Sequence, residues 1–497
     1  FIDHSPEQDQ NYLAKGVAEE IVALLGSSAK LKVIASSSVN TLLAKGLDPI
    51  SIARRLKVET VLTGTVRRTG NNLRMRVELI NVKDGKVLWA ESYTRNVDDI
   101  FALESAIARS ALNTLIEEFI TVDEFNNPSV TKNAEAYLMY LSGREAYRKQ
   151  TAEGLKEARK YYEQSIAIAP EFSQAYVALA DTIVLSADRE QQFEILQPQI
   201  AKTLAENYLA KALIRTQELS SAFAVQGKVF ELDGQLDNAL ASFNKAITIN
   251  PSLASAHKSK YAVLRSLGRE QEAFETLKTA LELDPESLSL RNDYGIELNK
   301  RMRLKEAEAV FAALIEDHPA SALGYAGLAT NFHRTGALSK SYQNWLKAHS
   351  ISPNNDKYFY PILSILVNLG MYDEALKLVD ESSLQAYILL SNNENEKLNE
   401  LMTSTREAFT NDPWVQFYST WFEIQTGNYS HAAKSLAFVD ETLSEAEKYL
   451  APQCSPAIEI AWAYLISGKD EKGQSILNSC AKELKQQQSS AIKLHAA

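Results

Sequence analysis

The chain has 497 residues, of which 45% are hydrophobic, and its formal net charge is −11. This length is sufficient for more than one hydrophobic core. The acidic balance argues against a protein that wraps nucleic acid, because such proteins need basic surface. No apolar run approaches the roughly 18 residues that a membrane-spanning helix requires. The chain begins at Phe1 rather than at methionine, and we interpret it as a piece of a longer protein.

Residues 1–119 predict a small α/β domain, because helical and alternating apolar patterns are mixed along this region. The residues from 59 to 95 alternate polar and apolar side chains, with turns at Gly70-Asn71-Asn72 and at Asp84-Gly85, which predicts a three-stranded antiparallel meander. The other predicted elements are helices over 9–27, 50–56 and 98–118, a short strand over 31–35, and a further strand that ends at Phe1.

Residues 120–132 are polar and contain Asn-Asn-Pro, which predicts a linker. Beyond the linker, prolines, glycines and small residues each recur with a step of 34 residues, which indicates stacked helical hairpins. The recurring positions are Pro251, Pro285, Pro319 and Pro353; Gly234, Gly268, Gly336 and Gly370, with Met302 in the series; and Ala239, Ala273, Ala307, Ser341 and Ala375. Glycine suits the turn, the small residue lets two helices approach, and proline ends the second helix.

This pattern resembles the tetratricopeptide repeat, so we expect an all-α solenoid, a right-handed superhelix, over residues 133–379. Regular units cover 220–253, 254–287, 288–321 and 322–355, and a further unit begins at 356. Residues 380–497 predict degenerate hairpins and a C-terminal cap, with Gly427, Ala432, Gly468 and Gly473 as the remaining markers. These hairpins would form either a dimer surface or only a cap.

Three motifs of the first domain resemble a second family. They are Val66, Arg67, Arg68 and Gly70; Trp89, Glu91 and Tyr93; and Asp99, Ile100, Phe101, Leu103 and Glu104. As a set they are similar to the domain related to the amino-terminal part of TolB, although Lys15-Gly16 stands where that family often has Asp-Gly.

In proteins with this domain and tetratricopeptide repeats, a winged-helix DNA-binding domain and one membrane helix often come first, as in CadC-like regulators. In other members an adenylate or guanylate cyclase domain comes first. The resemblance therefore implies a sensor or interaction module on the periplasmic side of the inner membrane of a Gram-negative bacterium. A free-standing periplasmic scaffold is the third alternative.

We find no nucleotide-binding glycine loop, nucleophile elbow or zinc-ligand spacing, so we expect no enzyme activity, cofactor or metal. Arg67 and Arg68 lie between a strand and a turn, where an anion would fit. Alternation sends these two side chains to opposite faces of the strand, which favours a structural role in which one packs over the sheet edge.

In a tetratricopeptide stack the first helix of each hairpin lines the concave groove. The prolines set the register and place a mostly basic set of side chains there. The candidate residues are Lys228, Lys258, Arg265, Asn292, Asn299, Lys300, His333 and Arg334. Such a groove suits an acidic peptide or a terminal carboxylate, through charge-assisted hydrogen bonds. The alternative is that these are ordinary solvated helix positions.

The two cysteines, Cys454 and Cys480, fall at opposite ends of the two helices of the last predicted hairpin. Antiparallel helices bring such ends together, so a disulfide is geometrically feasible, and it would indicate an oxidising compartment. The alternative is a pair of buried free thiols.

Overall fold

The computed structural model describes residues 1–5, 11–116, 133–187, 195–214, 219–353 and 355–379, with a few further residues between 385 and 401. The chain consists of two compact units, Phe1–Pro319 and Ala320–Ala497. None of the helices in the described ranges combines the length and the hydrophobicity that crossing a bilayer demands.

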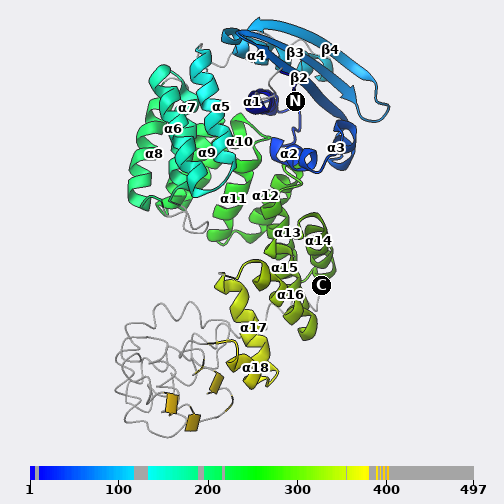
Figure 1. Cartoon of the computed structure of the whole chain (residues 1–497), viewed down its shortest axis with the longest axis vertical. Helices are drawn as coiled ribbons and strands as arrows, with labels where there is room; N and C mark the ends of the chain where they lie inside the picture. Colours follow the sequence, from blue (N-terminus) through cyan, green and yellow to red (C-terminus); the bar gives the residue numbers. More distant parts are fainter. Residues whose placement is uncertain are drawn as a thin grey trace. The chain divides into compact units, whose positions relative to one another are not determined.

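A four-stranded sheet forms the outer part of the α/β domain (Figure 1). Its strands are β1 (Ile2–Asp3), β2 (Thr60–Thr69), β3 (Asn72–Asn81) and β4 (Val87–Asn96), in the order β1-β2-β3-β4. Strand β1 is parallel to β2, and the other neighbours are antiparallel, which confirms the predicted meander. Gly70 makes the β2–β3 turn with a φ of 56°, a conformation that glycine adopts at little cost.

The helices of this domain are α1 (Asn11–Gly26), α2 (Ser36–Ala44), α3 (Pro49–Arg55) and α4 (Ile100–Ile116), with a short 3₁₀ turn over Val97–Asp99. Helices α1 and α4 supply Val17 and Ile100 to a core that also contains Val66 and Met75 of the sheet. They therefore cover one face of the sheet. Burial of these side chains is the main source of stability for such a layered domain.

The predicted strand over 31–35 is wrong, since this segment has no regular secondary structure. Its backbone bonds to the helical hairpins instead. The Val33 amide donates to the hydroxyl of Ser252 at 3.1 Å, and the Ala35 amide donates to the carbonyl of Leu283 at 2.8 Å. Buried backbone groups need partners, and here the partners are more than 200 residues away in the sequence. Helix α2, which follows directly, was not predicted.

Helical hairpins make up the rest of the first unit, as the fold class predicted. Their helices are α5 (Ala134–Arg148), α6 (Ala152–Ile168), α7 (Ser173–Leu185), α8 (Pro198–Leu213), α9 (Ser220–Leu232), α10 (Leu236–Ile249), α11 (Ala254–Ser266), α12 (Glu270–Leu283), α13 (Leu288–Lys300) and α14 (Leu304–Asp317). The second unit contains α15 (Ala322–Arg334), α16 (Leu338–Ile351), α17 (Asp356–Asn368) and α18 (Tyr372–Leu376).

The turn inside each regular hairpin requires one residue in the left-handed conformation. Gly234 and Gly268 supply it with φ values of 72° and 71°. In the third regular hairpin Met302 takes the same place with a φ of 58°. Its side chain is 45% exposed, so it is only partly buried there. A residue with a Cβ is strained in this conformation, so Met302 keeps the fold at an energetic cost.

Close packing between the two helices of a hairpin explains a glycine on the first helix of two hairpins. An ideal Cβ built on Gly227 would lie 2.5 Å from the ring of Phe243, and one on Gly295 would lie 2.5 Å from the ring of Phe311. These distances leave no room for a methyl group. The aromatic ring of the second helix therefore occupies the space that the glycine leaves open.

Candidate functional site

The α/β domain packs directly against the hairpins of the first unit. In addition to the backbone bonds of segment 31–35, two junctions of polar and charged side chains join them. The first is the α1–α5 junction, where α1 and α4 meet α5. The second is the turn junction, where α2 and α3 meet the turns that follow α12 and α14. The α1–α5 junction comprises Glu19, Glu20, Glu104, Tyr137, Tyr140, Arg144 and Arg148, and the turn junction comprises Ser38, Lys45, Arg55, Asp284, Glu286, Arg291 and Asp317.

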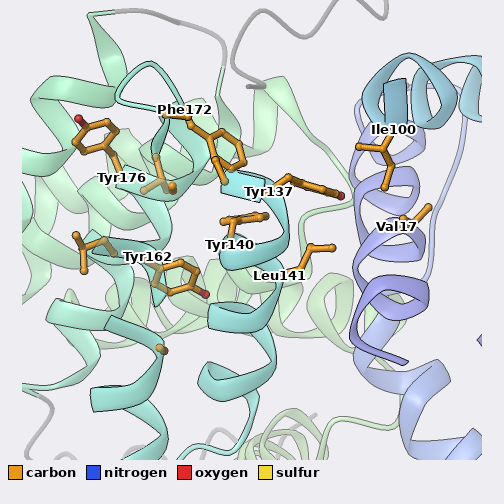
Figure 2. Close-up of a cluster of buried hydrophobic side chains, with 14 of the residues drawn as sticks. Val17, Ile100, Tyr137, Tyr140, Leu141, Tyr162, Phe172 and Tyr176 are labelled. Atoms are coloured by element: carbon orange, nitrogen blue, oxygen red, sulfur yellow. The ribbon is translucent and has the colours of Figure 1, made fainter. Parts of the chain in front are cut away.

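The apolar part of the α1–α5 junction brings the two domains into one core. Figure 2 shows Tyr137 and Leu141 of α5 pointing towards Val17 of α1 and Ile100 of α4. Gly16 permits this approach, because an ideal Cβ at that position would lie 2.4 Å from a methyl carbon of Leu141. The glycine of the Lys15-Gly16 pair therefore has a packing role in this chain.

Above this apolar contact, two arginines of α5 bind two neighbouring glutamates of α1. Arg144 Nη1 lies 2.8 Å from Glu20 Oε1, and Arg148 Nη2 lies 2.7 Å from Glu19 Oε1. Arg144 also pairs with Glu19. Burial raises the pKa of the Glu20 carboxyl, and the nearby Glu19 charge raises it further, while Arg144 and the Tyr140 hydroxyl act in the opposite direction.

A third glutamate lies deeper in the same junction. Glu104 of α4 is 3% exposed and accepts a hydrogen bond of 2.7 Å from the hydroxyl of Tyr137. Burial raises the pKa of the Glu104 carboxyl well above its usual value, and the charge of Glu20 raises it further. In turn, burial and the Glu104 charge raise the pKa of the Tyr137 hydroxyl well above its usual value. The pair is a short hydrogen bond that ties α4 to α5.

The turn junction is an ion network built on Asp317. This carboxylate lies 2.8 Å from Arg291, 3.0 Å from Arg55 of α3 and 3.1 Å from Lys45. Partial burial raises the pKa of Asp317, but the neighbouring cations lower it by more, so the net pKa is about 2. Arg55 also binds Glu286 at 2.8 Å, and it therefore links two turns of the hairpin array to one helix of the α/β domain.

Ser38 of α2 completes the turn junction. Its hydroxyl donates to the carboxylate of Asp284, and it accepts a hydrogen bond of 2.9 Å from the backbone amide of Glu286. Ser38 itself is fully buried. A buried hydroxyl with both a donor and an acceptor role in use fixes the position of α2 on this turn.

The structure places two of the predicted groove residues in ion pairs within the described part of the chain. Lys228 of α9 lies 2.7 Å from Asp181 of α7, and the other oxygen of that carboxylate accepts a 2.7 Å hydrogen bond from Tyr147 of α5. Lys300 lies 2.9 Å from the buried Glu297 on its own helix. These contacts join neighbouring hairpins or brace one helix, so these two lysines are partly neutralised.

The other candidates differ in exposure. Lys258 is exposed, and Arg265 is exposed with its guanidinium 5.7 Å from the centre of the Tyr261 ring. Asn292 is half-buried and Asn299 is buried. His333 and Arg334 are exposed at the end of α15, in the second unit. The groove stays a prediction. Cys454 and Cys480 lie outside the described residues, so the disulfide stays a prediction as well.

The side chains of Arg67 and Arg68 lie on opposite faces of β2, as the alternation of side chains along a strand requires. Arg68 is half-buried, its backbone amide bonds to the hydroxyl of Ser5, and its guanidinium donates to the carbonyl of Gly70 at 3.0 Å. Arg67 lies on the opposite face and is exposed. Its cross-strand partner is Arg74 of β3, which sequence reasoning missed, although the hairpin turn at Gly70 fixes this register.

Two family models match parts of the chain. Residues 6–109 match the second domain of HilA/YgeH-like transcriptional regulators, and residues 220–253 and 263–287 match the tetratricopeptide repeat. The first domain is therefore similar to a transcriptional-regulator domain, and the hairpins include tetratricopeptide repeats. The expected similarity to TolB and to CadC has no counterpart among these matches.

Among curated proteins, the putative adenylate cyclase 3 of Rhizobium meliloti is 32% identical over 181 residues, which cover 36% of this chain and 31% of that protein. The transcriptional regulator HilA of Salmonella typhimurium is 21% identical over 240 residues, or 48% of this chain and 42% of that protein. The chain thus spans about a third to two fifths of the length of these relatives.

Solved structures with partial similarity include tetratricopeptide repeat proteins. The tetratricopeptide repeat protein YrrB is 22% identical, with 40% of this chain and 96% of that chain covered and a TM-score of 0.30. Pseudomonas aeruginosa PilF is 17% identical, with 41% and 97% covered and a TM-score of 0.33. At such scores the likeness carries no argument.

Proposed function

We propose that this chain is the non-catalytic, partner-binding part of a regulatory protein. The repeats bind a protein or peptide, and the α/β domain passes the binding event on to the rest of the protein. The observation that carries this proposal is the double attachment of the α/β domain, to α5 and to the turns after α12 and α14. A partner that changes the spacing of these hairpins must act on α1, α2 and α3.

In the fuller form of the proposal, the protein is a membrane-anchored winged-helix transcriptional regulator, and this chain is its periplasmic half in a Gram-negative bacterium. The match of residues 6–109 to a transcriptional-regulator domain and the similarity to HilA support the regulatory role. The second candidate is the regulatory half of a nucleotide cyclase, which the 32% identity to a putative adenylate cyclase favours.

The sequence of the native gene upstream of Phe1 separates these alternatives. A basic winged-helix pattern followed by one apolar stretch of about 20 residues would support the membrane-anchored regulator. A cyclase domain would support the second candidate. A cleavable signal peptide directly upstream would contradict both and leave a free-standing scaffold.

Binding in the groove is tested with peptides selected by the purified chain from a random library displayed on phage. We expect the double variant Lys258→Ala and Arg265→Ala to weaken a selected peptide about tenfold or more, since it removes two exposed cations. The matched control is Lys305→Ala and Lys347→Ala, which removes two exposed lysines from second helices. Equal affinity of the groove variant and the unmodified chain would contradict the groove.

A further inference from the structure

The outward face of the sheet carries a cluster of arginines. Arg67 of β2 lies directly opposite Arg74 of β3, and Arg76 is the next outward residue along β3. All three side chains are exposed. On the same face, Ser92 and Thr94 of β4 are exposed opposite Arg76 and Arg74. No described element packs against this face, because α1 and α4 cover the other one (Figure 1).

The arrangement is unfavourable for the sheet alone. Residues directly opposite each other in antiparallel strands have Cβ atoms about 4.5–5.5 Å apart, and like charges at that distance repel. Arg76 is compensated by Glu78, at 2.8 Å on the same strand. Among the described residues, Arg67 and Arg74 make no ion pair or hydrogen bond through their side chains. Two adjacent guanidinium groups are thus left available, in a chain whose net charge is −11.

The strand next to this cluster is an open edge. Strand β4 (Val87–Asn96) pairs with β3, and in the part of the chain that the structure describes it has no neighbour on its other side. Ten residues of edge strand offer backbone donors and acceptors to an added strand. A strand added there would project every second side chain onto the outward face, beside Ser92 and Thr94.

We propose that the outward face of β2 and β3, together with the β4 edge, binds an extended acidic segment of a partner polypeptide. The backbone of the segment would pair with β4, and its carboxylates would reach over Ser92 and Thr94 towards the guanidinium groups that Arg74 and Arg67 extend across the face. This surface is separate from the repeats, and it gives the α/β domain a partner of its own.

The side chains on this face favour a polypeptide over nucleic acid. Proteins that bind single strands on a sheet stack the bases on aromatic rings. The outward positions beside the arginines are instead Thr65, Ser92 and Thr94, which offer hydroxyls and no stacking surface. The available cations are also few, whereas duplex binding needs many phosphate contacts. An extended acidic polypeptide offers carboxylates to the arginines and backbone groups to the open edge of β4.

The test is a binding titration of the full chain with a fluorescein-labelled poly-L-glutamate peptide that matches β4 in length. We expect the double variant Arg67→Gln and Arg74→Gln to bind about tenfold or more weakly, because two charge-assisted contacts are lost. The matched control, Lys83→Gln and Lys86→Gln, removes the same charge from exposed lysines of the β3–β4 turn and should bind as the unmodified chain does.

A second variant protects the test against misfolding. Thr94→Glu places a carboxylate opposite Arg74, competes with the peptide from within the sheet, and should also weaken binding. Equal affinity of the arginine variant and the unmodified chain, or an equal loss in the lysine control, would overturn the inference. Tighter binding of an oligothymidylate through the same arginines would overturn the choice of a polypeptide. Loss of the peptide only in Lys258→Ala with Arg265→Ala would overturn this surface and leave the groove standing.

Discussion

Replacing Arg144 by methionine is the sharpest perturbation of the α1–α5 junction. Arg144 binds both Glu19 and Glu20, and its side chain is 29% exposed while that of Glu20 is 15% exposed. Methionine keeps much of the stem that packs on α5 but removes the charge. Glu19 retains Arg148, whereas Glu20 keeps only a 3.3 Å hydrogen bond from Tyr140.

Loss of one partner from a buried ion pair typically costs about 3–5 kcal/mol, because the other charge stays buried and uncompensated. Here we expect a smaller cost, about 2–3 kcal/mol, since Glu20 can be protonated and its pKa is already raised by burial. At 1.36 kcal/mol for each factor of ten, this corresponds to roughly a hundredfold easier opening of α1.

Hydrogen exchange of the full chain, followed by mass spectrometry, measures this opening locally. We expect peptides from α1 to lose roughly a hundredfold of protection in Arg144→Met at pH 7, and clearly less at pH 5, where Glu20 is more readily neutral. Peptides from α15 and α16 serve as an internal reference. Arg159→Met is the matched control, because Arg159 binds Glu163 in an exposed pair that is worth a few tenths of a kcal/mol.

Two outcomes would refute this reasoning. If α1 keeps its protection in Arg144→Met, the ion pairs do not hold the junction. If the loss is the same at pH 5 and pH 7, the cost does not come from an uncompensated Glu20 charge.

Three further predictions concern single positions. Met302→Gly should raise the free energy of unfolding by about 1 kcal/mol in urea titrations, because glycine relieves the left-handed strain, and Met302→Ala should not. Gly295→Ala should cost about 1–3 kcal/mol through its clash with Phe311, and adding Phe311→Leu should recover part of the loss; an unchanged urea midpoint would contradict the packing argument. The two junctions should also respond oppositely to pH. The pKa of Glu104 is raised, so this residue adds stability as the pH falls from 7 towards the usual glutamate pKa of 4.5. Glu104→Gln should remove that gain. The lowered pKa of Asp317 contributes stability above its usual value of 3.8, which is lost as the pH falls towards 2, so Asp317→Asn should flatten this acid limb of thermal unfolding curves.

The local features of the fold followed from the sequence because their causes are local. The alternation of residues 59–95 predicted β2, β3 and β4, and the step of 34 residues predicted the hairpins together with the turn position that Met302 occupies. Asp48 precedes the predicted helix over 50–56, and its carboxylate accepts from the amides of Ile50 and Ser51 at the start of α3. Each of these signals depends either on residues a few positions apart or on one fixed step along the chain.

The junctions were not predictable in the same way, because their partners are far apart in the sequence. Arg55 and Asp317 are separated by 262 residues, and nothing near either residue identifies the other. The segment 31–35 was predicted as a strand, but the amides of Val33 and Ala35 bond to Ser252 and Leu283. The ion pair of the candidate groove residue Lys228 was missed for the same reason, since its partner Asp181 is 47 residues away.

The turn junction has a mechanical consequence for the array. A stack of hairpins is elastic, because each hairpin contacts only its neighbours and small rotations between them add up along the stack. The α/β domain spans successive turns of this stack, from Ser252 through Glu286 to Asp317, and it bonds to each of them. It therefore acts as a rigid brace along one edge, and these hairpins bend together or release a contact. Stretching a single molecule by its two ends should show these hairpins yielding in one step with the α/β domain.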